Sequence, residues 1–313
     1  MRCPVCKTEC ESSNTCNECG FSDVGKMFVN QEDATQWVNS VVIPYRDNYN
    51  NANILSPVDW LKVLKQNSQA KQLFEFSIPA SLKRRVAFDQ LKDPGDADYS
   101  IYQSDATLDH IAFISTSELV RKQFINVLND SYLHITDFKR VVSACIEQTS
   151  DLAALLTNLS PGETLLFEIN SKIKKDMVAL MARALRDFSL DIILGKGPTA
   201  RSILLDLPCF TAIFVADSVS AIPVDIANIL SSIIEINPSQ EELDELQIRE
   251  VAPCYSIQLT KANVEVIKKA LSQKNFKNVK SILRFISDYL YLHTEIHQPL
   301  SRNAMQEIIE QLS

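Results

Sequence analysis

The residues best suited to chemistry in this 313-residue chain are five cysteines within its first 19 positions. Cys3 and Cys6 form one CxxC pair. Cys16 and Cys19 form a second pair, and nine residues separate the two. Each pair can present two thiolates to one ion, and a module this small has little hydrophobic core to hold it together without one. The spacing therefore predicts a structural Zn²⁺ site, or zinc ribbon, with Cys3, Cys6, Cys16 and Cys19 as ligands.

The remaining cysteines show no such spacing. Cys10 lies between the two pairs and is either a spare thiol or a ligand in place of one of the four. Cys145, Cys209 and Cys254 lie among apolar residues, which favours packing in the core over chemistry. Crowded cysteines in a reducing compartment indicate metal binding rather than disulfides.

Composition narrows the functional classes. The chain is 46% hydrophobic and 22% charged, which is ordinary for a globular protein. Its formal net charge of −8 does not attract nucleic acid, so any such contact needs a local basic surface. The N-terminal MRCPVCK lacks the apolar stretch of a signal peptide, and no run approaches the roughly 18 apolar residues of a membrane span. We therefore expect a cytoplasmic protein with no membrane association.

Strand and helix patterns divide the chain into four parts. Helical patterns over 33–47 and 50–75 follow the cysteines. Short apolar runs then alternate with helical patterns, which is typical of a parallel α/β sheet, and only helical patterns follow residue 236. The expected parts are a zinc ribbon (1–24), a helical linker (25–79), an α/β domain (80–236) and a helical domain (237–313). The expected strands are 110–115, 164–167, 203–207 and 211–216, and the expected helices are 119–129, 150–159, 174–188, 239–250, 260–272, 276–293 and 302–312.

Residues 190–206 depart from this alternation. Two strand-like arms flank the sequence Gly195-Lys196-Gly197-Pro198, whose glycines and proline favour a turn. The segment therefore predicts a β-hairpin.

Several stretches carry a family resemblance. Residues 151–162 (DLAALLTNLSPG), residues 187–211 (DFSLDIILGKGPTARSILLDLPCFT) and the lead-in 107–110 (TLDH) resemble the large ATPase domain of RuvB-type Holliday-junction branch-migration motors. The resemblance covers 107–217 and returns faintly at 281–289, where the family has a lid helix. It implies an AAA+ α/β core, with the helical domain as its lid.

The residues at the family's phosphate loop have changed. Where the family carries a loop of the type GPPGxGKT, this chain has Ser115-Thr-Ser-Glu-Leu-Val-Arg121-Lys122, without a glycine. Glu118 places a negative charge at the loop. Arg121 falls where the lysine belongs, and a guanidinium does not replace a compact ammonium. Lys122 is the one residue here that could still reach a phosphate.

Four further parts of the implied ATP site differ from the family. Glu168 matches the glutamate that activates water, but Phe167 stands in place of the metal-binding aspartate. Asp217 ends the sensing strand where the family has a Thr-Thr-Arg run, residues 224–228 carry no finger arginine, and the lid's sensor arginine falls near Lys277. Each such loss costs about 10³-fold in rate, so we do not expect bound ATP or ADP or ATP hydrolysis.

Partner binding is expected at three places. The hairpin, which in the family contacts the partner that holds the four-way junction, carries Lys196 and Arg201 here, although it can also serve packing alone. The zinc ribbon has an acidic balance, which favours protein contact over phosphate contact. Residues 261–284 carry seven cations and one acid and are a candidate DNA-binding face, or else a solvated helix pair that attracts the acidic stretch 235–250.

Three functional hypotheses follow. The first is a non-catalytic, zinc-carrying RuvB-like pseudo-ATPase that acts as a scaffold or regulatory subunit in DNA recombination, repair or defence. The second is a divergent motor that still binds ATP. The third is a clamp-loader-like subunit, although the zinc module of those proteins usually lies inside the ATPase domain rather than ahead of it.

Overall fold

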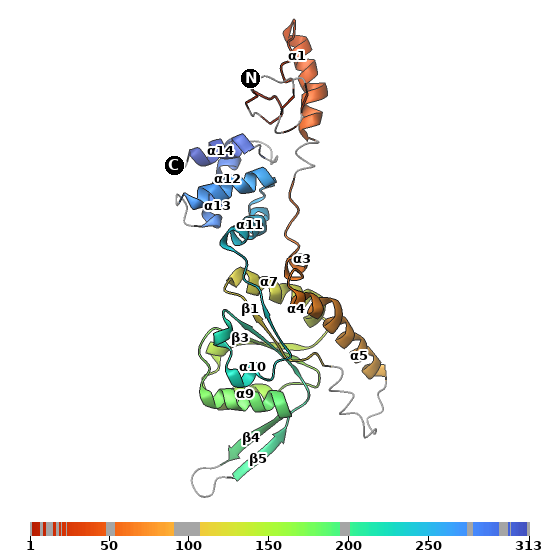
Figure 1. The fold of residues 1–313 in the computed structure, drawn as a ribbon, viewed down its shortest axis with the longest axis vertical. Coiled ribbons are helices and arrows are strands. Elements are labelled where there is room, and N and C mark those ends of the chain that lie inside the picture. Colours follow the sequence, from red (N-terminus) through yellow and green to blue (C-terminus); the bar gives the residue numbers. More distant parts are fainter. Residues whose placement is uncertain are drawn as a thin grey trace. The chain divides into compact units, whose positions relative to one another are not determined.

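The computed structural model describes residues 2–6, 9–10, 15–16, 19, 21–22, 24–47, 54–90, 107–194, 201–273, 278–293, 300 and 302–311. They fall into two compact units, one comprising Asp59–Asn237 and the other Met1–Val58 with Pro238–Ser313 (Figure 1). The predicted AAA+-like α/β core is confirmed in the first unit, and the predicted helical region is confirmed in the second.

The first unit is built on a five-stranded parallel sheet with the order β2-β3-β6-β1-β7. The central strands are apolar on both faces because helices cover both, which is why they were recognisable as apolar runs. The two edge strands, β2 and β7, were not predicted, because most of their side chains are exposed or half-buried. The strands are β1 (Ile111–Ile114), β2 (Phe138–Val142), β3 (Thr164–Ile169), β6 (Thr211–Ala216) and β7 (Ser232–Glu235).

Helices cover the two faces of this sheet. One face packs its alternate side chains, Leu165 and Phe167 among them, against the helices that follow β2 and β3. On the other face Phe113 of β1 stacks on Phe124 at 3.9 Å between ring centroids, and Phe74 lies 6.1 Å from the same ring. The helical segments of this unit are α3 (Trp60–Leu64), α4 (Ser68–Gln72), the π-helical turn η2 (Leu73–Ser77), α5 (Ile78–Gln90), α7 (Glu118–Leu128), η3 (Asn129–Leu133), η4 (Ser143–Cys145), α8 (Thr149–Thr157), α9 (Lys175–Asp187), η6 (Val219–Ala221) and α10 (Val224–Ala227).

The predicted hairpin forms between α9 and β6. Its arms β4 (Ser189–Leu194) and β5 (Arg201–Asp206) pair antiparallel, with Ser189 opposite Asp206 and Leu194 opposite Arg201. Lys196 lies outside the described residues, as does the side chain of Arg201.

The Ser-Pro-Gly turn before β3 shows why part of the family motif is kept. Gly162 has φ +74°, a conformation that favours glycine, and its amide donates to the carbonyl of Cys209 at 2.8 Å. Arg85 of α5 donates to the carbonyl of Gly162 at 3.0 Å. The turn therefore links α5 to the loop that precedes β6.

In the C-terminal part of the second unit, the described helices α11 to α14 surround their own core, in which Ile267, Ile282 and Met305 are fully buried. The segment before α3 lies along them, since the Leu55 amide donates to the carbonyl of Leu259 at 2.7 Å. The helices are α11 (Gln240–Val251), the turn η7 (Ala252–Tyr255), α12 (Lys261–Ser272), α13 (Val279–His293) and α14 (Arg302–Glu310).

The N-terminal cysteines pack against the helix that follows them, formed by α1 (Gln31–Trp37) and η1 (Val38–Val42). Phe21 lies 5.9 Å from the Trp37 ring and 5.0 Å from the Tyr45 ring. The Tyr45 hydroxyl donates to the carbonyl of Cys19 at 3.0 Å. Residues 25–47 therefore lie against the cysteine module, whereas α3, α4 and α5 belong to the α/β unit.

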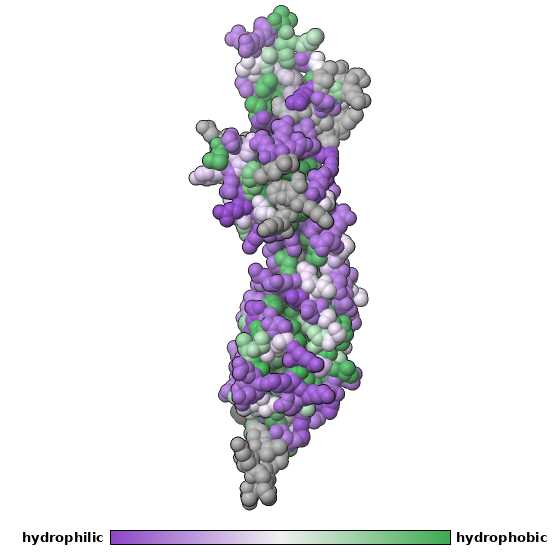
Figure 2. Space-filling view, turned by 90° about the vertical axis from the view of Figure 1, so that its left-hand side faces the viewer, coloured by the Kyte–Doolittle hydropathy of each residue, from purple (hydrophilic) through white to green (hydrophobic). Residues whose placement is uncertain are grey.

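One expectation about the other cysteines is wrong. Cys145 and Cys254 are exposed, and Cys209 is half-buried. Both exposed residues lie in short helical turns, η4 and η7. In such a turn, side chains adjacent in sequence point in different directions, so apolar neighbours do not imply a buried cysteine. No helix of the described part is both long and apolar enough to cross a membrane. The face in Figure 2 carries mainly hydrophilic residues with scattered apolar ones.

Candidate metal centre and altered nucleotide site

The four cysteines of the two CxxC pairs converge at one point. All are buried, and their Sγ atoms lie within 4.8 Å of one another. Cys3 and Cys19 have Sγ atoms 3.6 Å apart, and those of Cys6 and Cys16 are 3.5 Å apart. Four sulfurs at about 2.3 Å from a tetrahedral zinc ion would lie about 3.8 Å apart, so the cluster fits such an ion closely.

The surroundings of the cluster suit a structural rather than a catalytic metal. Cys10 is also buried, but the converging set of four does not include it. Burial raises the pKa of the Cys19 thiol, and a divalent cation is the group that would favour the thiolate instead. Four sulfur ligands leave no open position for a reacting water.

Side-chain oxygens of the turn that follows β1, and of Asn237 after β7, accept hydrogen bonds from the amides of this turn. The amide and the hydroxyl of Thr116 both donate to Asn237 Oδ1, at 2.8 and 3.2 Å. The Ser117 amide donates to Ser115 Oγ at 3.3 Å, and the Val120 amide donates to Ser117 Oγ at 3.5 Å. A phosphate loop offers such amides to its ligand, whereas these are satisfied within the protein.

Arg121 closes the same turn from the other side. Its Nη1 donates to the carbonyl of Ser115 at 2.5 Å and to the carbonyl of Thr116 at 3.2 Å. One nitrogen of the half-buried guanidinium therefore donates to two backbone oxygens of the turn. Lys122, one residue further along α7, is exposed.

The acidic remnant on β3 is engaged by a neighbouring strand. Arg140 of β2 donates through Nε to Glu168 Oε1, and this bond raises the pKa of Arg140. Phe167, at the position of the expected metal-binding aspartate, is 2% exposed and lies 5.7 Å from the ring of Phe214. Glu168 is thus held in an ion pair, whereas Phe167 belongs to the hydrophobic core. Sequence reasoning missed Arg140 because its edge strand was not predicted.

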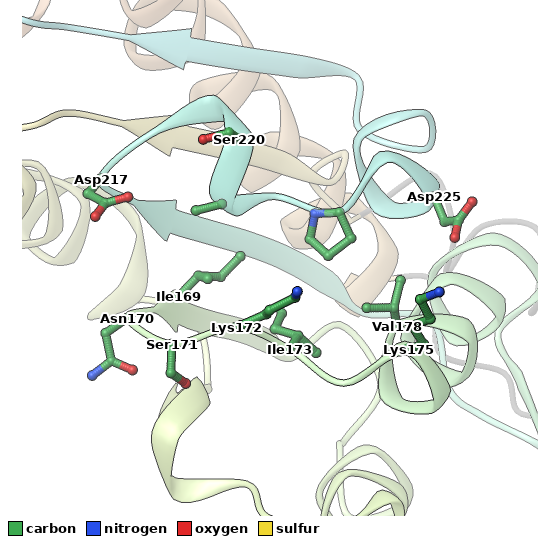
Figure 3. Close-up of a pocket in the computed structure, with 12 residues that line it drawn as sticks. Ile169, Asn170, Ser171, Lys172, Ile173, Lys175, Val178, Asp217, Ser220 and Asp225 are labelled. Atoms are coloured by element: carbon green, nitrogen blue, oxygen red, sulfur yellow. The ribbon is translucent and has the colours of Figure 1, made fainter.

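A pocket of about 720 Å³ lies at the carboxyl ends of β3 and β6. Figure 3 shows the Lys172 side chain across its middle, with Asn170 and Asp217 toward one end and Lys175 and Asp225 toward the other. Two lysines and two aspartates line it, so its charge does not favour a polyanion such as a nucleoside triphosphate.

His110 has a structural position between strand and helix. Its Nδ1 accepts the Ala212 amide at 2.9 Å, so Nε2 carries the proton and donates to the carbonyl of Leu185 at 3.1 Å. Burial lowers the pKa of His110, which favours this neutral form.

The sequence-predicted remnants of the ATP site have different surroundings. Arg121 and Glu168 each have protein partners, Lys122 is exposed, and Lys277 lies outside the described residues. Asn237, which accepts from the turn, was not predicted, because a single polar residue after a strand carries no signal of its own.

The cations of the lid are partly neutralised. Lys268 of α12 contacts Glu241 at 2.9 Å and Glu265 at 3.1 Å, and these bonds raise its pKa. Arg284 lies 3.9 Å from Asp288. The expected attraction between the two charged helices therefore occurs at Lys268. The other lid cations in the described part, Lys261, Lys269 and Lys280, are exposed.

Comparison with known proteins identifies relatives of the α/β unit. Residues 99–232 match the family model described as the Holliday junction DNA helicase RuvB P-loop domain. Over 106 residues the chain is 39% identical to the Holliday junction branch migration complex subunit RuvB of Campylobacter lari, a stretch that covers 34% of this chain and 31% of that protein. The chain thus spans about a third of this curated relative.

Solved structures show the same fold. Two structures of mutant Thermotoga maritima RuvB align with TM-scores of 0.52 and 0.50, each at 15% identity. The alignments cover 80% and 75% of this chain and 70% and 68% of those chains.

Proposed function

We propose that this chain, whose residues 99–232 match the RuvB P-loop domain model, is a non-catalytic scaffold or regulatory subunit of an assembly that processes DNA in recombination, repair or defence. The family description names a P-loop, which in general cradles nucleotide phosphates. The proposal therefore depends on the residues by which this chain departs from its family.

The observation that carries the proposal is that amides of the turn after β1 already donate to side-chain oxygens of the protein. Asn237 takes the Thr116 amide, and Arg121 covers the carbonyl groups of the turn. A triphosphate would have to displace these bonds and would meet Glu118 on the first turn of α7. Desolvated carboxylate and phosphate charges repel one another, so binding in the family's manner is disfavoured.

The state of the acidic residues supports the same proposal. Phe167 offers no oxygen to Mg²⁺, and Glu168 is paired with Arg140. Hydrolysis by this domain would need both a metal ligand and a free carboxylate at the end of β3.

ATP turnover, measured with and without a four-way DNA junction, tests this proposal. We expect the same residual rate for the wild-type chain and for Glu168→Gln, because the glutamate activates no water. Turnover that the junction stimulates and that Glu168→Gln abolishes would contradict it. The paired variant separates activity of this site from a contaminating ATPase.

Lys122 favours a second candidate, a divergent subunit that binds ATP without the family's loop. This lysine is exposed next to the turn, where its flexible side chain could reach a phosphate. Mg-ATP binding that Lys122→Ala weakens would support this candidate.

The zinc ribbon and the hairpin are proposed as the elements that bind a protein partner. The β5 side chains Ile203, Leu204 and Leu205 are 47%, 58% and 38% exposed. An apolar strand left open in this way suits a protein contact better than solvent. DNA contact through residues 261–284 remains part of the proposal, with Lys261, Lys269 and Lys280 as its exposed cations.

A further inference from the structure

One aromatic side chain on the α/β unit is left in solvent by the way its segment packs. In the π-helical turn η2, Phe74 is 8% exposed and packs against Phe124. Phe76, two residues later, is 65% exposed. A ring that is mostly in solvent is available for contact with a ligand.

Two cations lie on the same side of this helical segment. Lys83 and Arg84 of α5 are exposed and follow Phe76 by seven and eight residues, about two helical turns. The buried positions of the segment, Phe74 and Ile78, mark the opposite side. The ring of Phe76 is therefore accompanied by two positive charges on one solvent-facing surface, which we call the α5 surface.

The charges of the α5 surface are not cancelled within the described residues. Glu75 lies 3.4 Å from Lys65 and 4.0 Å from Lys71, and neither Lys83 nor Arg84 has an acidic partner within 4.0 Å there. Residues 60–90 contain six cations and two acids, in a chain whose net charge is −8. The six cations are Lys62, Lys65, Lys71, Lys83, Arg84 and Arg85, and the two acids are Glu75 and Asp89.

The surface is also held in place. Arg85, next to Arg84, donates to the carbonyl of Gly162 in the turn before β3. Phe74 fixes the preceding turn against α7. A ligand would therefore meet cations and an aromatic ring on an element whose opposite side is already anchored.

We propose that Phe76, Lys83 and Arg84 form a binding surface for single-stranded nucleic acid. An exposed aromatic ring stacks with an unpaired base of any sequence, and flanking cations attract the phosphates on either side of it. The inference rests on the proposed function only in expecting DNA as the nucleic acid. An acidic protein would use the two cations but would have no need of an exposed ring.

The lid cations make a useful contrast. Lys268 and Arg284 face carboxylates there, and the exposed Tyr291 of α13 lies two turns from Arg284, with Asp288 between them. These two lid cations therefore offer weaker local attraction to phosphate than Lys83 and Arg84 do.

The test is fluorescence anisotropy of the full-length, zinc-loaded chain with a labelled oligothymidylate longer than the roughly 4–16 nucleotides that such a site covers. We expect Phe76→Ala to weaken binding about tenfold, which is the effect of losing one stacked base, and to leave duplex binding nearly unchanged. Lys83→Gln with Arg84→Gln should weaken both and lower the slope of log affinity against log salt by about 1.4, or 0.7 for each lost phosphate contact.

Lys175→Gln with Arg186→Gln is the matched control, because it removes one exposed lysine and one exposed arginine from α9 of the same unit. We expect it to leave oligothymidylate binding unchanged. Wild-type chain that does not bind the oligonucleotide, or equal losses in the control and in the α5 variants, would overturn the inference. ATP turnover is measured separately. Absence of oligothymidylate binding would therefore leave the non-catalytic proposal standing, and junction-stimulated turnover would leave the proposal for the α5 surface standing.

Discussion

At the carboxyl end of β1, three side-chain oxygens accept the amide hydrogens that a phosphate loop would offer to its ligand. They belong to Asn237, Ser115 and Ser117. None of the three could be assigned this role from the sequence, although the missing glycines there did predict that the loop was altered. Sequence shows which residue types a site has lost, but the contacts that replace them depend on segments brought together by folding.

The first prediction concerns Arg121. Arg121→Ala should lower the free energy of unfolding by about 1–2 kcal/mol, because two carbonyl groups lose a charged donor. Urea denaturation measures the change. Lys122→Ala, at the neighbouring exposed position, is the control and should change stability by less than about 0.5 kcal/mol. Equal effects of the two substitutions would refute the closing role of Arg121.

The second prediction concerns pH. Burial lowers the pKa of His110 in the folded chain, so below the ordinary value of about 6.5 the unfolded chain binds a proton that the folded chain does not. His110 therefore contributes stability above pH 6.5, and this contribution is lost as pH falls, by at most about 1.4 kcal/mol per pH unit.

The matched variant is His110→Asn, whose side-chain oxygen can still accept the Ala212 amide but does not titrate. Denaturation between pH 7.5 and 5 should show a steeper loss for the wild-type chain than for the variant. Parallel curves would mean that His110 is not held neutral.

At the scale of elements, the sequence predicts best those segments whose pattern is imposed by burial. The apolar runs of β1, β3 and β6 were recognisable in this way, and each forms. The hairpin was recognisable from its turn residues instead, and its arms pair although the β5 side chains are exposed. The edge strand β2 was missed because its side chains are only half-buried, and with it the Arg140–Glu168 pair was missed. The cysteine module belongs to the predictable kind, since ligand type and spacing define it without reference to the rest of the chain.

The third prediction concerns that module. Native mass spectrometry should find one zinc ion per wild-type chain and none in Cys16→Ser, because three sulfurs no longer complete the tetrahedral set. Cys10→Ser should retain the metal, since the converging set does not contain Cys10. Loss of zinc in Cys10→Ser with retention in Cys16→Ser would show that the ligands are exchanged.

Chelation provides an independent measurement of the same module. A strong chelator should expose residues 24–47 to protease while leaving the α/β unit resistant, because α1 and η1 pack on the cysteines. Unchanged cleavage after removal of the metal would contradict a structural role for zinc.

For the whole molecule, the net charge of −8 does not attract DNA, so any contact with DNA depends on local basic surfaces rather than on the overall electrostatic field. The matched domain and the fold relate it to RuvB, and the chain spans about a third of the curated relative. Two of its expected differences from a RuvB-type nucleotide site lie at the turn after β1 and at the end of β3. Both differences disfavour nucleotide binding, because a nucleotide needs amides that hold its phosphates and an acid that holds its metal.

Isothermal titration of the zinc-loaded chain with Mg-ATP and with Mg-ADP tests the central claim most directly. We predict no heat of binding up to millimolar nucleotide, because the amides of the turn and the guanidinium of Arg121 are already engaged. Saturable binding at micromolar nucleotide would contradict the account and would mean that the turn opens to accept a phosphate.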